Sequence, residues 1–240
     1  MKNVAILLAG GIGKRMDSGD IPKQFLEVDG KPILVYTIEV FQAHPEIDGI
    51  ILVCVSTWID YARKLVEDYG LTKVREIIPG GATGHESRLF GLRCAGKYYD
   101  DAVVLLHDGV RPLIDAATVS KAIETTRAHG SAVVCSPVTE TIYFEDEHVR
   151  AVIPRDQCSL MRSPQCFMLS HILKIHEQAD AEGCHDSIDA LTLMQQYEKS
   201  VSGVPRVLGP AENIKITTPL DFYMFEGIMK SRKKKQETEA

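Results

Sequence analysis

Hydrophobic residues gather in short continuous runs that alternate with longer segments in which they recur every three or four positions. The runs are typical of buried strands, and the spaced segments are typical of amphipathic helices. Strands are predicted at 3–9, 49–55, 74–79, 102–107 and 131–138. Helices are predicted at 33–44, 58–70, 85–99 and 116–130. This alternation predicts an α/β fold with a Rossmann-like, mostly parallel sheet flanked by helices.

The alternation of predicted strands and helices stops after Pro137. Two extended segments, 141–144 and 149–153, flank the polar stretch "EDEH" and predict a β-hairpin arm within 138–156. The arm either projects and embraces a neighbouring subunit or folds over its own domain, and the pattern leaves both open. Helices at 172–181 and 188–196, a strand at 204–208 and a helix from Pro219 follow. The charged residues 231–240 are predicted to form a flexible tail.

Composition and charge narrow the class of protein. With 240 residues, 45% of them hydrophobic, the chain can form one domain over 1–240. A net charge of -6 without a basic stripe argues against nucleic-acid binding. We expect no membrane span, because none of the apolar runs reaches the roughly 20 residues that one needs. Six scattered cysteines without metal-ligand spacing predict reduced thiols and a cytoplasmic protein.

The first predicted strand runs into "LLAGGIGKRM", a glycine loop that carries Lys14 and Arg15, with Lys23 shortly after it. Glycines let the backbone approach a ligand closely, and clustered cations indicate that the ligand carries phosphate. The loop is not a Walker A motif, because Arg15 stands where that motif has Ser or Thr. It also lacks the third glycine of the dinucleotide fingerprint, since Met16 occupies that place. What remains is a glycine loop after the first strand, carrying cations that could neutralise a triphosphate.

Six blocks in order, "LLAGGIGKRM", "PKQFLEVDGKPIL", "GGATGHESRLFGL", "HDGVRP", "RSPQCF" and "NIKITTPLDF", span nearly the whole chain. Together they resemble the cytidylyltransferases that act on small polyol phosphates. That family includes 2-C-methyl-D-erythritol 4-phosphate and ribitol-5-phosphate cytidylyltransferases. The resemblance implies a nucleotidyltransferase fold of the glycosyltransferase-A-like kind. It also implies a reaction in which a polyol phosphate attacks the α-phosphorus of CTP, giving a CDP-polyol and pyrophosphate.

The same resemblance implies roles for particular residues. Catalytic cations that stabilise charge at the α-phosphate match Arg15, Lys23 and Lys215. The nucleotide-binding set matches Leu8, Ala9, Gly10, Gly11, Gly13, Gly80, Gly81, Ser87 and Asp108. The set that binds the polyol phosphate matches Asp108, Arg111, Thr141, Arg155 and Ser163. Asp108 would also hold a Mg²⁺ cofactor, for which one carboxylate plus phosphate oxygens suffices.

The sequence departs from the family pattern at two places, and the resemblance also implies a partner subunit. Ser163 stands where the family has a threonine, and the serine keeps the hydroxyl. Asp186 and Asp189 fall where relatives carry "TDEA", and we interpret them as helix-entry residues. In these dimeric enzymes the arm reaches the neighbouring active site, so a homodimer is implied, with Thr141 and Arg155 contributed across the interface.

The acceptor and two rival classes stay open at this stage. Trp58 and the blocks "HDGVRP" and "PKQF" favour ribitol 5-phosphate, whereas "PVTETI" and the arm favour 2-C-methyl-D-erythritol 4-phosphate. We lean to ribitol 5-phosphate. A dinucleotide-dependent oxidoreductase is disfavoured, because Val55 and Ser56 stand where it needs an acidic residue. A nucleotide-binding protein without catalysis is the alternative from another class. His107 is interpreted as structural. The attacking phosphate is already ionised, so the reaction implied by the resemblance needs no general base.

Overall fold

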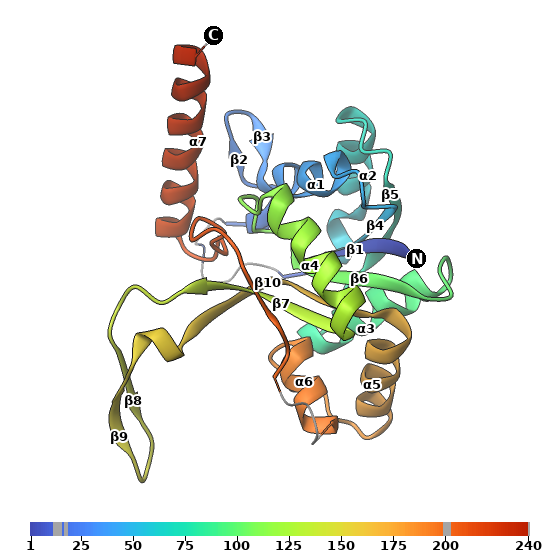
Figure 1. Ribbon diagram of the computed structural model, residues 1–240. Coiled ribbons are helices and arrows are strands. Elements are labelled where there is room, and N and C mark those ends of the chain that lie inside the picture. Colours follow the sequence, from blue (N-terminus) through green and yellow to red (C-terminus); the bar gives the residue numbers. More distant parts are fainter. Residues whose placement is uncertain (12–15, 17–18, 199–202, 240) are drawn as a thin grey trace.

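The computed structural model describes residues 1–11, 16, 19–198 and 203–239. In these residues one sheet has the strand order β11-β7-β10-β6-β1-β4-β5 (Figure 1). Its strands are β1 (Lys2–Ala9), β4 (Gly49–Cys54), β5 (Val74–Pro79), β6 (Ala102–Asp108), β7 (Ser131–Pro137), β10 (Ser159–Met168) and β11 (Arg206–Leu208). β1, β4, β5 and β6 pair in parallel, and β11 is parallel to β7, whereas β10 is antiparallel to both of its neighbours. The predicted α/β class and mostly parallel sheet are confirmed.

Helices cover both faces of the sheet (Figure 1). Those of one face are α1 (Ile33–Ala43), α2 (Ile59–Asp68) and α4 (Ala116–His129). Those of the other are α3 (Gly84–Gly96), α5 (Leu169–Ala181) and α6 (Ala190–Tyr197). Along β1, Ala5 and Leu7 join the first layer while Val4 and Ile6 join the second, because successive side chains of a strand point to opposite faces. The sheet is therefore apolar on both sides, as its continuous hydrophobic runs predicted.

Short elements complete the chain. They are η1 (Lys23–Phe25), β2 (Glu27–Val28), β3 (Lys31–Pro32), η2 (Ser56–Trp58) and η3 (Arg155–Gln157). A third apolar cluster joins Phe225 of the last helix to Val28 and Ile33. None of the described helices is both long and apolar enough to cross a membrane.

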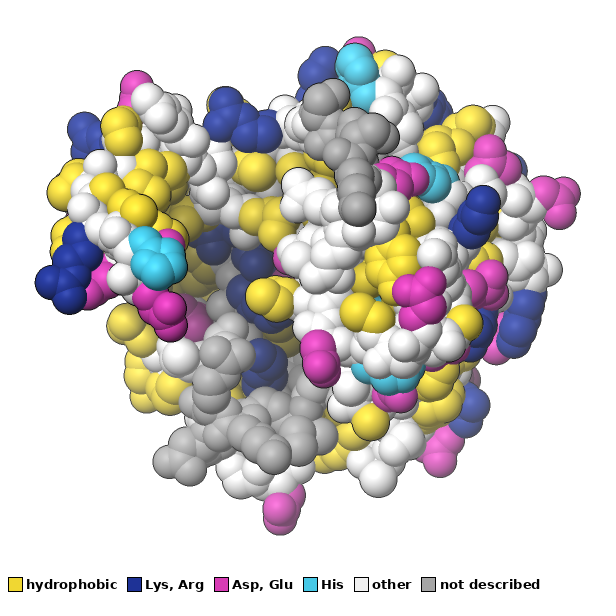
Figure 2. Space-filling model, turned by 90° about the horizontal axis from the view of Figure 1, so that it is seen from below, with side chains coloured by type: hydrophobic (Ala, Val, Ile, Leu, Met, Phe, Trp, Pro, Cys, Tyr) yellow, Lys and Arg dark blue, Asp and Glu magenta, His cyan; other side chains and the backbone are white. Residues whose placement is uncertain are grey.

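The predicted hairpin forms from β8 (Ile142–Glu145) and β9 (Arg150–Ile153), which pair antiparallel. It extends away from the sheet, so the projecting arrangement is the one adopted (Figure 1). Apolar side chains on it face solvent, with Tyr143 59% and Val152 65% exposed. In Figure 2 the hairpin forms a separate lobe beside a hollow, with yellow hydrophobic side chains on its surface.

Two features differ from the sequence-based expectation. The segment 231–240 was predicted to be a flexible tail, but α7 (Pro219–Glu239) continues through it to Glu239. Lys, Arg, Gln and Glu there favour helix, and neither Gly nor Pro interrupts them. The strand β10 was not predicted, because Arg162, Ser163 and Pro164 break its apolar pattern; the register shift between Met161 and Gln165 accommodates them.

Candidate active site

A cavity of about 720 Å³ lies where the carboxyl ends of β1 and β6 meet. Open α/β sheets bind their ligands at this edge. Its walls come from 8–11, 23–24, 81–84, 87–88, 161–163 and 188–190, together with Leu106, Asp108, Val110, Arg111, Gln165, Lys215 and Thr217. Figure 2 looks into the hollow, where Lys and Arg side chains lie in its depth. Among the described lining residues, the cations are Lys23, Arg88, Arg111, Arg162 and Lys215, and the carboxylates are Asp108 and Asp189. This excess of positive charge suits an anionic ligand.

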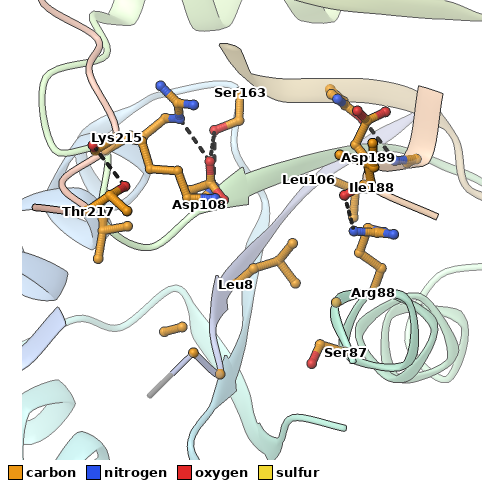
Figure 3. A pocket seen from close by; sticks show the side chains of 18 of the residues that line it. Leu8, Ser87, Arg88, Leu106, Asp108, Ser163, Ile188, Asp189, Lys215 and Thr217 are labelled. Carbon is orange, nitrogen blue, oxygen red and sulfur yellow. Dashed lines mark hydrogen bonds and ion pairs between the residues drawn. The ribbon is translucent and has the colours of Figure 1, made fainter. Parts of the chain in front are cut away.

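Asp108, at the end of β6, carries the main ion pairs of the cavity (Figure 3). Its Oδ1 accepts from Lys215 Nζ at 2.7 Å, and its Oδ2 accepts from Arg111 Nε at 2.8 Å. Burial alone would raise the pKa of this carboxyl, but the charges of Lys215 and Arg111 outweigh burial and hold the pKa well below its usual range. The carboxylate therefore stays ionised and fixes the position of both cations.

Arg111 also joins the turn after β6 to the segment that carries Lys215. Its guanidinium is 9% exposed and donates through Nη1 to the backbone oxygen of Asn213 at 2.8 Å. Asn213 Nδ2 in turn donates to the backbone oxygen of Ser163 at 2.9 Å. The backbone N–H of Ile216 donates to Val110 O at 3.0 Å. These bonds place Lys215 at the cavity although it lies far from Asp108 in the sequence.

His107 is buried beneath this group and supports it. Its Nε2 lies 3.1 Å from the backbone oxygen of Arg111, and a carbonyl only accepts, so Nε2 carries the proton. Nδ1 then accepts from Ser163 Oγ at 3.0 Å, and that oxygen accepts from the Asp108 N–H at 3.1 Å. Burial lowers the pKa of His107 to about 4, so the ring is neutral. His107 is structural, as expected, and it orients Ser163.

The glycine segments on both sides of the cavity pack against each other. A Cβ added at Gly80 would lie 3.3 Å from Gly10 Cα and 3.1 Å from Ser87 Oγ, so larger residues would separate the two loops. Ser87 Oγ accepts from Gly81 N–H at 3.1 Å. Thr83 and Glu86 form a capping box that fixes the first turn of α3 beneath Ser87. Gly10, Gly11, Gly81 and Ser87 thus line one wall together.

Most of the predicted site residues come together at the cavity. Those that line it are Leu8, Ala9, Gly10, Gly11, Lys23, Gly81, Ser87, Asp108, Arg111, Ser163 and Lys215. Gly80 lies directly behind this wall. Thr141 and Arg155 belong to the arm and are not among the described lining residues; Arg155 donates to Thr139 O at 3.3 Å instead. Gly13 and Arg15 lie outside the residues that the structure describes.

The sequence analysis missed several lining residues. Gln24 Nε2 donates to Ala9 O at 2.7 Å and so holds the glycine loop to η1. Its signal was its place in "PKQF", directly after Lys23. Arg88 is 6% exposed and donates through Nη2 to Ser187 O at 2.8 Å. Its Nη1 donates to Ile188 O at 3.3 Å, and this bond fixes the wall formed by Ile188 (Figure 3). No local pattern marks Arg88, because its partner lies about a hundred residues away.

A mostly parallel sheet with a cationic, glycine-lined cavity at its carboxyl edge defines a nucleotide-binding α/β enzyme. A family model described as IspD: 2-C-methyl-D-erythritol 4-phosphate cytidylyltransferase matches residues 3–231. The chain belongs to this family, and it is a nucleotidyltransferase of the cytidylyltransferase class.

Relatives and solved structures agree with this assignment. A ribitol-5-phosphate cytidylyltransferase of Streptococcus agalactiae serotype V is 44% identical over 98% of each chain. A 2-C-methyl-D-erythritol 4-phosphate cytidylyltransferase of Geotalea uraniireducens is 40% identical over 96% of this chain and 98% of the relative. The crystal structure of 4-diphosphocytidyl-2C-methyl-D-erythritol synthase from Anaerococcus prevotii superposes with a TM-score of 0.80 at 27% identity, covering 95% of this chain and 96% of that one.

Proposed function

We propose that the enzyme joins CTP to D-ribitol 5-phosphate, giving CDP-ribitol and pyrophosphate. The observation that carries this choice is the 44% identity over 98% of the chain to a relative named for ribitol 5-phosphate. Relatives named for the methylerythritol phosphate reach 40%. The alternative acceptor is therefore 2-C-methyl-D-erythritol 4-phosphate. We treat residues 1–240 as one catalytic unit.

The geometry supports an in-line transfer. An oxygen of the polyol phosphate attacks the α-phosphorus of CTP, and the bond to pyrophosphate breaks. Both reactants are anions, so the cations of the cavity hold them together and stabilise the charge that develops. Lys23 and Lys215 serve this role. By family resemblance Arg15, which belongs to the glycine loop "LLAGGIGKRM", serves it as well. Asp108 holds Lys215 in place at 2.7 Å.

The donor set fits a magnesium ion. Asp108 is ionised, and its two oxygens keep lone pairs beyond those that Lys215 and Arg111 use. Magnesium needs one or two carboxylates and takes its other ligands from phosphates and water. Asp108 would hold the ion, which when bound neutralises triphosphate charge.

The arm supports a homodimer. Its exposed apolar residues, including Tyr143, Phe144 and Val152, would be buried against a second copy. Thr141 and Arg155 do not line the described cavity of their own chain, so a partner's arm would bring them to the polyol phosphate. We place the enzyme in the cytoplasm, which agrees with its six unpaired cysteines.

The test is pyrophosphate release with CTP and Mg²⁺, first with each acceptor alone and then with both at matched concentrations. Mass spectrometry of the mixed reaction identifies the CDP product. We expect CDP-ribitol to dominate, whereas dominance of the methylerythritol product would reassign the acceptor. Release with neither acceptor, from folded protein that still binds CTP, would support the nucleotide-binding alternative. Lys215→Ala is the inactive control.

A further inference from the structure

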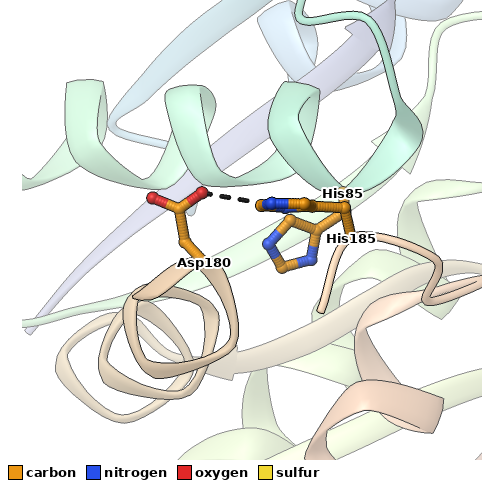
Figure 4. A group of neighbouring side chains, drawn as sticks. All are labelled: His85, Asp180 and His185. Atoms are coloured by element: carbon orange, nitrogen blue, oxygen red, sulfur yellow. Dashed lines mark ion pairs between the residues drawn. The ribbon is translucent and has the colours of Figure 1, made fainter. Parts of the chain in front are cut away.

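A second group of potential ligands lies outside the active-site cavity. One ring nitrogen each from His85 and His185 and one carboxylate oxygen of Asp180 all lie within 4.8 Å of one another (Figure 4). His85 belongs to the first turn of α3 and Asp180 to the last turn of α5, while His185 follows α5. None of the three is among the described residues that line the active-site cavity. The cluster is therefore separate from the transfer chemistry.

Two ring nitrogens in this cluster have no hydrogen-bond partner in the described part of the chain. His85 is fully buried, and its Nδ1 faces Ser187 Oγ at 3.4 Å, which leaves Nε2 without a partner among the described residues. Nδ1 of His185 is also buried and has no hydrogen-bond partner among the described residues. It lies 3.8 Å from Asp180 Oδ1. A buried polar atom without a partner is costly and calls for a bound species.

Neighbouring contacts fix the orientation of these donors. His176 stacks on His85 with ring centroids 5.2 Å apart and planes 17° apart. Arg93 Nη2 donates to Asp180 Oδ2 at 3.3 Å, so Oδ1 is the oxygen turned to His185. The contact between His85 Nδ1 and Ser187 matches the usual arrangement of a metal-bound histidine, whose second nitrogen donates to an oxygen. His85 is thus held in place before any ion arrives, whereas the side chains of Asp180 and His185 are partly exposed and can adjust.

We propose that His85, Asp180 and His185 bind one zinc ion. Two imidazoles and a carboxylate suit zinc, whereas magnesium prefers oxygen ligands alone, so this ion is distinct from the magnesium of the reaction. Zinc bonds of about 2.0–2.2 Å require ligand atoms about 3.4 Å apart, and rotation of the two partly exposed side chains closes the difference. His185 and Asp180 are 39% and 32% exposed, so water completes the coordination.

Such an ion would fix one wall of the active site. It would join α3 and α5 to the segment that follows α5, which continues into the cavity-lining residues Ile188 and Asp189. Ser187, between the two sites, contacts His85 and accepts from Arg88 Nη2 at 2.9 Å. Zinc binding is expected to stabilise the folded protein, because the ion binds a site that the unfolded chain lacks.

The test measures zinc directly and does not depend on turnover. Full-length protein is stripped with a chelator, dialysed and titrated with zinc in competition with a chromophoric chelator. We expect one zinc per chain and a higher Tm on binding. His185→Ala and Asp180→Asn should each weaken zinc binding at least tenfold while circular dichroism stays unchanged. His171→Ala, a half-exposed histidine paired with Glu198, is the matched control and should bind as wild type.

Three further results distinguish the proposed site from a zinc site that uses the Cys184 thiolate or the Asp108 carboxylate. Cys184→Ser and Asp108→Asn should retain zinc, and the cobalt-substituted protein should show tetrahedral absorption without a thiolate charge-transfer band. Absence of bound zinc, or unchanged affinity in both His185→Ala and Asp180→Asn, would overturn the proposal. Loss of zinc in Cys184→Ser or Asp108→Asn would overturn it as well, because the ion would then occupy a different site.

Discussion

At the scale of single residues, the carboxylate of Asp108 organises the active site. It contacts Lys215 from a distant segment and Arg111 from its own turn, both within 2.8 Å. The two cations hold the pKa of Asp108 low despite burial. Since Lys215 is 43% exposed, its ammonium borders the cavity and can reach a bound phosphate. One carboxylate therefore sets the position of Lys215, for which we propose a catalytic role.

Removing a catalytic cation should reduce turnover. Lys215→Ala and Lys23→Ala are each expected to lower kcat about 10²–10³-fold, because charge that develops in the transition state loses a fixed cation. Steady-state pyrophosphate release measures the effect, and circular dichroism checks the fold. Lys64→Ala, an exposed lysine of α2, is the control. Near-normal kcat in either variant would remove that residue from the mechanism.

Burial should control the reactivity of the cysteines. Cys54, Cys94, Cys135 and Cys166 are buried, and burial raises the pKa of Cys54 to about 11 and that of Cys94 to about 12. Since the thiolate is the reactive form, only the two remaining cysteines, both partly exposed, should react with a thiol reagent at pH 8. Absorbance should report about two thiols per native chain and six after denaturation. Six fast-reacting thiols in the native protein would contradict this assignment.

At the scale of elements, local chemistry decides where helices begin and end. The carboxylate of Asp115 accepts from Thr118 N–H at 2.7 Å and caps the start of α4. Gly130 closes the same helix with φ at 84°, a left-handed conformation that glycine adopts without strain. The helix predicted at 116–130 thus begins and ends next to these two residues. The strand β10 was missed, since its interruption by polar residues resembles a loop.

Removal of the cap at Asp115 should cost measurable stability. Asp115→Ala is expected to lower the free energy of unfolding by about 1 kcal/mol, because one backbone donor of α4 loses its acceptor. Chemical denaturation measures the change. Glu124→Ala, on the exposed face of the same helix, should stay within about 0.5 kcal/mol of wild type. Equal losses in both variants would contradict a specific contribution of the Asp115 cap.

At the scale of the whole molecule, the proposed function gives the arm the role of completing the active site of a second chain. The arm extends away from the sheet (Figure 1), and its residues Thr141 and Arg155 are not among the described residues that line the cavity. Its hydrophobic surface faces solvent in the single chain. A dimer that buries this surface would use both chains for each site.

Mixed subunits test this sharing. An Arg155→Ala chain keeps Lys23, and a Lys23→Ala chain keeps Arg155, so a heterodimer of the two has one intact site if arms are exchanged. We expect about half of wild-type activity from isolated heterodimers, against strong losses in both parent homodimers. Native mass spectrometry verifies the pairing. Verified heterodimers without recovered activity would show that each site is built within one chain.

The sequence by itself determined most of the elements and the family. Continuous apolar runs such as 102–107 predict buried strands, because both faces of a parallel sheet are covered by helices. The glycine loop and the charged blocks carried the family resemblance, and most residues named from them line the cavity. These features are local, so short stretches of sequence suffice to reveal them.

Only the tertiary structure decided which distant residues meet. Arg88 contacts Ser187, and Gln24 holds the backbone at Ala9, through contacts that no local pattern encodes. The cluster of His85 with Asp180 and His185 was likewise hidden in the sequence. The physical reason is that periodicity reports which face of an element is buried, whereas a binding site depends on which faces pack together.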